Sequence, residues 1–178
     1  MQTNKSHHIF RQFNETIEKW IISLDDYTLD MLLRKPAKGS WSLGQVYVHI
    51  VEDTKYFVQR MTDALANDAN AHRSMHEDAR TIFHNNGFPD AQLTGPATDD
   101  NVRQPGSKTE LLQGLLFIQD EVNKLYAAYN LEGAAGKTEH PGLGFFTAPE
   151  WLQFAEMHLR HHFRQKKRID DLLTSASL

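Results

Sequence analysis

The sequence predicts an all-α protein, a four-helix bundle with at least one long crossover connection. Three observations predict this fold class. Apolar residues recur at helical spacing in four long segments, capping boxes begin three of those segments, and no segment shows a convincing strand pattern. The chain has 178 residues, of which 40% are hydrophobic, enough for one core of ordinary size. We therefore expect a single domain over residues 1–178.

The first long helix is expected from His8 to about Leu24, where apolar side chains fall three and four residues apart. A short helix is expected within residues 27–33, before Pro36 interrupts the chain. The second long helix begins after Ser42. Its start is defined by a capping box with Gln45, and the helix is expected to run to about residue 65.

Residues 67–106 form a connection rich in Asn, Asp, Gly and Pro, with a short helix expected near residues 74–85. A capping box of Ser107 and Glu110 begins the third long helix, which is expected to end near residue 130.

The fourth helix follows a glycine-rich loop over residues 131–146. Thr147 and Glu150 form its capping box, and Phe146 and Trp151 are placed as the hydrophobic staple beside it. The helix is expected to continue to about residue 173.

Composition excludes several functions. The formal net charge is -4, from 19 Lys and Arg against 23 Asp and Glu, so the whole-molecule field does not favour a nucleic-acid partner. The chain has no cysteine, which excludes disulfides, cysteine-bound zinc and a thiol nucleophile of its own. The sequence shows neither a signal-peptide pattern nor an apolar run of about 18 residues, so we expect a cytoplasmic protein without a membrane partner.

Histidines interrupt the apolar stripe of the fourth helix at His158 and His162. Positions four apart lie on one helix face with Cβ atoms about 5–6 Å apart, so both rings can point at one atom. His161 lies about 100° around the axis and cannot easily join them. Core histidines satisfied by separate hydrogen bonds are the alternative. A shared metal ion satisfies both rings at once and is the hypothesis we favour.

A third ligand is expected from a facing helix, and His49 on the second long helix borders an apolar face there. Asp53, four residues later, or Glu52 could accept a hydrogen bond from the ring nitrogen of His49 that does not bind the metal. Taken alone, a histidine in this position is more often satisfied by hydrogen bonds than by a metal.

Three stretches together resemble the DinB-like superfamily, four-helix bundles also described as DinB/YfiT-like metalloenzymes. They are WSLGQVYVH, which begins at Trp41, HPGLGFFTAPEW, which begins at His140, and HLRHHFRQ, which begins at His158. They cover less than half of the chain.

The resemblance implies a divalent metal ion, zinc or nickel, bound by His49, His158 and His162 with open positions for water or substrate. Some relatives transfer or isomerise small molecules with a low-molecular-weight thiol such as bacillithiol, mycothiol or glutathione. A small-molecule substrate is therefore expected, with a low-molecular-weight thiol as cosubstrate. Homodimers are common in the family, and the sequence leaves the oligomeric state open.

Three functions follow from such a site. The first is a thiol S-transferase, the second a metal-dependent hydrolase, and the third a module that binds a metal or ligand without catalysis. Zincin-type hydrolysis is excluded because Leu159 stands where those enzymes place their glutamate. Other bases remain open for a hydrolase, namely Glu52, Asp53, Glu156 and His140. His140 is also a candidate to contact substrate, and Gln165 to orient a ligand or contact substrate.

Overall fold

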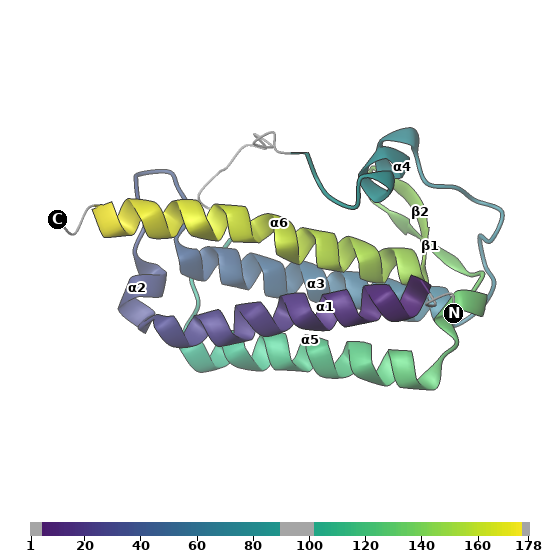
Figure 1. Cartoon of the computed structure of the whole chain (residues 1–178), viewed down its shortest axis with the longest axis horizontal. Helices are drawn as coiled ribbons and strands as arrows, with labels where there is room; N and C mark the ends of the chain where they lie inside the picture. Colours follow the sequence, from purple (N-terminus) through teal and green to yellow (C-terminus); the bar gives the residue numbers. More distant parts are fainter. Residues whose placement is uncertain (1–4, 90–101, 176–178) are drawn as a thin grey trace.

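The computed structural model describes residues 5–89 and 102–175. Four long helices lie side by side along its long axis (Figure 1), namely α1 (Lys5–Ser23), α3 (Leu43–Leu65), α5 (Lys108–Ala128) and α6 (Ala148–Ser175). Helices α1 and α3 each contact both α5 and α6, so the four helices close around one core. The predicted all-α four-helix bundle is confirmed. No helix in the described ranges is both long and apolar enough to span a membrane.

The directions of α3 and α5 show why the connection between them is long. Helix α3 ends, and α5 begins, at opposite ends of the bundle (Figure 1). The connection between them therefore has to span its length, as the sequence predicts. It contains the short helix α4 (Glu77–His84), and α2 (Leu29–Leu33) precedes α3; both short helices were expected. Single 3-10 turns follow α1 at Leu24–Asp26 and α5 at Leu131–Gly133.

Two of the three predicted capping boxes are complete. The Gln45 amide donates to Ser42 Oγ over 3.1 Å, and the Ser42 amide donates to Gln45 Oε1 over 3.0 Å. At the start of α6, the Thr147 amide donates to Glu150 Oε2 over 2.7 Å, and the Glu150 amide donates to Thr147 Oγ1 over 3.4 Å. Both helix starts are thus fixed by local sequence.

The capping box predicted at Ser107 is only half present. Ser107 Oγ accepts from the Glu110 amide over 3.1 Å. The Glu110 side chain, however, accepts from the Gly106 amide over 2.8 Å and pairs with Arg103 instead of returning to Ser107. The nearby guanidinium offers the carboxylate a charged partner, and this partner could not be placed from sequence.

The glycine-rich loop before α6 contains a small β-hairpin, which the sequence pattern had not indicated. Strands β1 (Lys137–His140) and β2 (Gly144–Thr147) pair antiparallel, with His140 opposite Gly144. Glycines allow the tight turn because Gly142 and Gly144 adopt φ of 91° and 84°, where a side chain is strained. Each strand has only four residues, too few to show a clear alternation.

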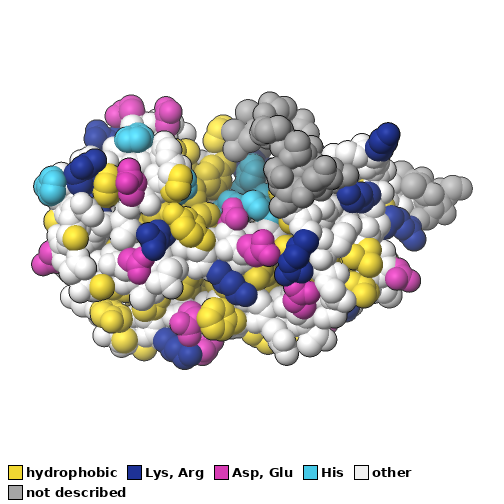
Figure 2. Space-filling view, turned by 180° about the vertical axis from the view of Figure 1, so that it is seen from behind, with side chains coloured by type: hydrophobic (Ala, Val, Ile, Leu, Met, Phe, Trp, Pro, Cys, Tyr) yellow, Lys and Arg dark blue, Asp and Glu magenta, His cyan; other side chains and the backbone are white. Residues whose placement is uncertain are grey.

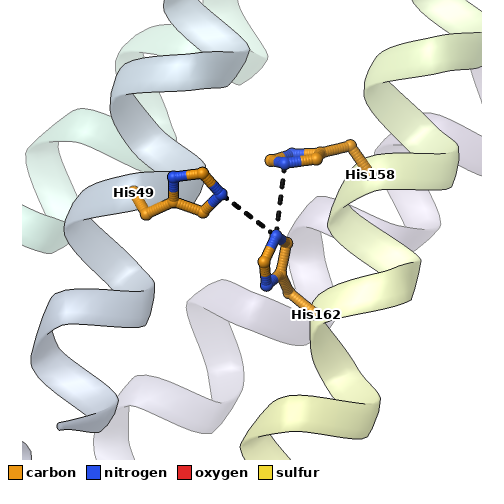
Figure 3. A group of neighbouring side chains, drawn as sticks. All are labelled: His49, His158 and His162. Atoms are coloured by element: carbon orange, nitrogen blue, oxygen red, sulfur yellow. Dashed lines mark hydrogen bonds between the residues drawn. The ribbon is translucent and has the colours of Figure 1, made fainter. Parts of the chain in front are cut away.

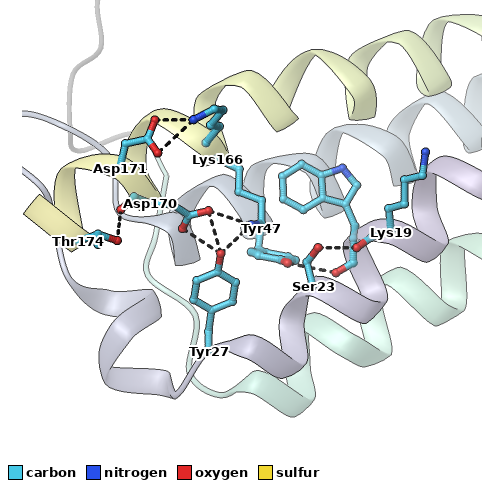
Figure 4. A network of polar contacts seen from close by, with 10 residues as sticks. Lys19, Ser23, Tyr27, Tyr47, Lys166, Asp170, Asp171 and Thr174 are labelled. Carbon is cyan, nitrogen blue, oxygen red and sulfur yellow. Dashed lines mark hydrogen bonds and ion pairs between the residues drawn. The ribbon is translucent and has the colours of Figure 1, made fainter.

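Helix α6 is tied to the rest of the bundle by buried rings and by a polar network. Trp20 of α1 is fully buried, stacks on Phe163 at 4.5 Å between ring centroids, and donates its indole N–H to the Leu159 carbonyl over 3.1 Å. Further along α6, the Lys166 ammonium and Asp170 carboxylate both bond Tyr27 Oη, at 2.6 and 2.8 Å (Figure 4). These contacts hold the helix that carries two of the predicted ligands.

Candidate metal centre

Three imidazole rings converge between α3 and α6 (Figure 3). His162 Nε2 lies 3.2 Å from His49 Nε2 and 3.2 Å from His158 Nε2. The ligand nitrogens of the three residues all lie within 4.8 Å of one another, so together they could hold one metal ion. The structure thus brings together the three residues that the sequence singled out.

The spacing of these nitrogens fits a transition-metal ion. Zinc–nitrogen bonds of about 2.0–2.1 Å in a tetrahedral site place two nitrogens about 3.3–3.4 Å apart. The two separations from His162 Nε2, 3.2 Å each, are close to that value, and the ligand nitrogens of His49 and His158 lie within 4.8 Å of each other. Hydrogen bonds between the neutral rings alone would require His49 and His158 to share the single Nε2 lone pair of His162. A single cation accepts a lone pair from each of the three rings.

Gln165 orients one of these rings. Its Oε1 lies 2.8 Å from His162 Nδ1, so Nδ1 carries the proton and donates it to this amide oxygen. The neutral ring then has its lone pair on Nε2, which faces the other two histidines. A hydrogen bond to the outer nitrogen of a metal-binding histidine commonly fixes the tautomer in this way.

Burial keeps the three rings neutral. It lowers the pKa of His162 to about 3 and holds that of His158 well below its ordinary value. The neighbouring histidines lower both pKa values further. Burial also lowers the pKa of His49, although the nearby Asp53 carboxylate acts in the opposite direction. Neutral imidazole is the form that binds a metal ion, so the site is prepared for one at neutral pH.

These lowered pKa values predict how the metal-free protein responds to acid. Below pH 6.5 the unfolded chain takes up protons on these histidines and the folded chain does not, so the free energy of unfolding falls as pH falls. Each histidine can change the free energy of unfolding by at most about 1.4 kcal/mol per pH unit. Asp53, whose pKa burial raises, acts in the opposite direction. Urea unfolding between pH 7.5 and 4.5 should show a shallower slope for His162→Gln, and equal slopes would contradict this account.

Asp53 does not lie where the sequence suggested. We expected it to accept from the outer nitrogen of His49. Its Oδ2 instead lies 3.6 Å from Nε2 of His49 and 3.6 Å from Nε2 of His158, on the side where the ligand nitrogens converge. Glu52, the alternative, faces Arg103 at 3.6 Å and is more than half exposed.

The other two candidate bases lie apart from the three histidines. Glu156 is buried in a bidentate pair with Arg160 and also accepts from Thr16 Oγ1 over 3.0 Å. His140, at the end of β1, packs on the rings of Trp151 and Phe154, and its Nδ1 is buried without a partner. Of the four bases weighed for a hydrolase, only Asp53 contacts the histidines in the described part of the chain.

Aromatic rings surround the histidines, and the sequence analysis had not identified them. Phe57 lies edge-on to His158 at 5.4 Å between centroids, and Trp41 lies 5.2 Å from His49. Phe57 could have been found, because it stands eight residues after His49 on the same helix face. Phe88, which contacts His161 at 5.5 Å, belongs to an irregular segment that no periodicity identifies. His161 itself lies outside the three-histidine group, as expected.

Part of the site is exposed at one face of the protein. Histidine side chains lie in a hollow on that face, with acidic and hydrophobic side chains beside them (Figure 2). The side chains of His49 and His158 are 21% and 12% exposed, whereas His162 is buried. Two of the three candidate ligand side chains are therefore partly exposed to solvent.

In this all-α bundle two facing helices present three converging imidazoles, an arrangement that could hold a metal ion. The sequence profile of the DinB superfamily matches residues 12–165, which include all three histidines. The chain therefore belongs to the DinB superfamily. No curated protein matches the chain in sequence.

Proposed function

We propose that this protein binds zinc or nickel through His49, His158 and His162 and acts as a transferase that uses a low-molecular-weight thiol. The observation that carries the proposal is the convergence of three neutral imidazole nitrogens in a hollow at the surface. A divalent cation held by neutral imidazoles keeps its full charge and lowers the pKa of a thiol or water at an open position.

The residues of the chain support a borrowed sulfur nucleophile. With no cysteine, the protein has no thiol of its own, so the sulfur has to arrive on a small molecule. Gln165 holds His162 in the required tautomer, and the aromatic rings of Phe57 and Trp41 limit water around the histidines. These groups bind, orient and partly desolvate the reacting centre.

The proposed reaction is a substitution at an electrophilic carbon. The sulfur of the cosubstrate attacks this carbon, the carbon–sulfur bond forms and the bond to the leaving group breaks. The proton of the thiol passes to solvent, and the leaving group departs with the bonding electron pair. No oxidant or reductant is needed.

The test is to incubate zinc- or nickel-loaded protein with bacillithiol, mycothiol or glutathione and a chromogenic haloarene. One thiol should give metal-dependent release of halide, and His49→Ala should lower its rate at least about 100-fold. His72→Ala is the matched control, because His72 is an exposed histidine outside the group. Release no faster than without protein would contradict the transferase proposal, and ester cleavage without thiol would favour the hydrolase instead.

A further inference from the structure

We propose that Asp53 is a fourth protein ligand of this metal centre. The inference rests on the metal-binding part of the proposed function. It goes beyond the three-histidine set, because Asp53 supplies an oxygen donor from α3 and changes both the charge and the number of open positions at the site.

The placement follows from how α3 and α6 face one another. Each helix presents a pair of side chains four residues apart, His49 with Asp53 on α3 and His158 with His162 on α6. The helices run in opposite directions, so the first member of one pair meets the second member of the other (Figure 1). His49 therefore faces His162, and Asp53 faces His158.

The four donor atoms form a closed ring of short distances. His162 Nε2 is 3.2 Å from the Nε2 atoms of both His49 and His158. Asp53 Oδ2 closes the ring at 3.6 Å from each of the same two nitrogens. Donor atoms that share one cation are spaced in this range, because metal–nitrogen and metal–oxygen bonds are both about 2.0–2.2 Å for zinc.

The direction of the carboxylate argues against an indirect role. A carboxylate that only orients a metal-binding histidine contacts the outer ring nitrogen, as Gln165 does with Nδ1 of His162. Asp53 contacts Nε2 of two rings, and Nε2 of His162 completes the same cluster. Its carboxylate therefore lies on the metal side of the rings.

Charge also favours a cation beside Asp53. Its partners within ion-pair distance in the described ranges are the rings of His49 and His158, each at 3.6 Å. Nearby basic side chains have other partners. Lys55 lies over the Phe117 ring at 5.5 Å from its centroid, Arg60 pairs with Asp63, and Arg103 pairs with Glu52 and Glu110. A bound divalent cation would supply the positive charge that the carboxylate lacks.

A fourth protein donor restricts the choice of metal. On a tetrahedral zinc ion, four protein donors leave no position for a thiol. A cation that accepts five or six ligands keeps such a position, so the proposed transferase reaction with Asp53 bound favours nickel over tetrahedral zinc.

The test compares Asp53→Asn with Glu52→Gln in metal-free protein titrated with nickel against a competing chelator. Each substitution replaces a carboxylate by an amide of similar volume. The Glu52 carboxylate, however, faces Arg103 and solvent instead of the three histidines. Asp53→Asn should weaken nickel binding at least about tenfold, and Glu52→Gln should leave it unchanged. Circular dichroism and urea unfolding of the metal-free variants check that both remain folded.

The visible absorption of cobalt-loaded protein separates a ligand from a residue that acts through another. Loss of an oxygen donor should shift the cobalt bands of Asp53→Asn, whereas Glu52→Gln should keep the native spectrum. Native affinity together with a native spectrum in Asp53→Asn would overturn the inference and leave the three-histidine site intact. A native protein that binds neither nickel, cobalt nor zinc would overturn the proposed function itself.

Discussion

Replacing His162 by glutamine is expected to weaken zinc or nickel binding by more than about 100-fold, a larger loss than removal of a supporting hydrogen bond causes. His162 Nε2 lies 3.2 Å from the nitrogens of both other histidines, so it links the two helices of the site. Its loss leaves one histidine on each helix. Competition titration with a chromophoric chelator measures the change.

His161→Gln is the matched control for this variant. It alters the adjacent residue of the same helix, removes the same chemical group, and lies outside the cluster of ligand nitrogens. Native metal affinity is expected for it. Equal losses in the two variants would mean that the helix, and not the ligand set, had been disturbed.

Trp20→Ala is expected to lower the free energy of unfolding by about 3–5 kcal/mol, measured by urea unfolding of the metal-free protein. The indole is fully buried, stacks on Phe163 and meets Tyr47 edge-on at 5.0 Å between centroids. Its removal leaves a cavity between α1, α3 and α6 and ends the hydrogen bond to the Leu159 carbonyl. The loss falls next to the helix segment that carries the metal ligands.

Ile22→Ala provides the comparison on the same helix. Ile22 is 63% exposed, so its truncation should change the free energy of unfolding by no more than about 0.5 kcal/mol. If Trp20→Ala costs no more than Ile22→Ala, the described packing of α1 on α6 is contradicted.

The helices could be predicted because helical spacing and capping boxes are signals contained within each segment. Helical spacing of apolar residues located four long helices, and the capping boxes at Ser42 and Thr147 gave two starts to the residue. The half-formed box at Ser107 depends on Arg103, which precedes the helix and pairs with Glu110, and the hairpin at Lys137–Thr147 makes contacts beyond its own two strands. The Phe145 amide of the hairpin, for example, donates to the Ser74 carbonyl of the crossover connection.

The candidate site was also predictable only where it depends on the geometry of a single helix. The spacing of His158 and His162 depends only on helix geometry, and His49 could be found as the histidine bordering an apolar face of another helix. The Asp53 carboxylate lies beside Nε2 of both His49 and His158. Its approach to His158 depends on the antiparallel register of α3 and α6, which local sequence does not reveal. Phe88 lies 6.5 Å from His158 between ring centroids and belongs to an irregular segment, so its position depends on tertiary packing.

The central claim is that His49, His158 and His162 hold a metal ion. The most direct measurement is elemental analysis of protein purified without chelators and without a nickel column, beside His49→Ala and His158→Ala. The account predicts close to one zinc or nickel ion per chain in the native protein and almost none in either variant. A native protein without metal, even after reconstitution with zinc, nickel or manganese, would contradict the account.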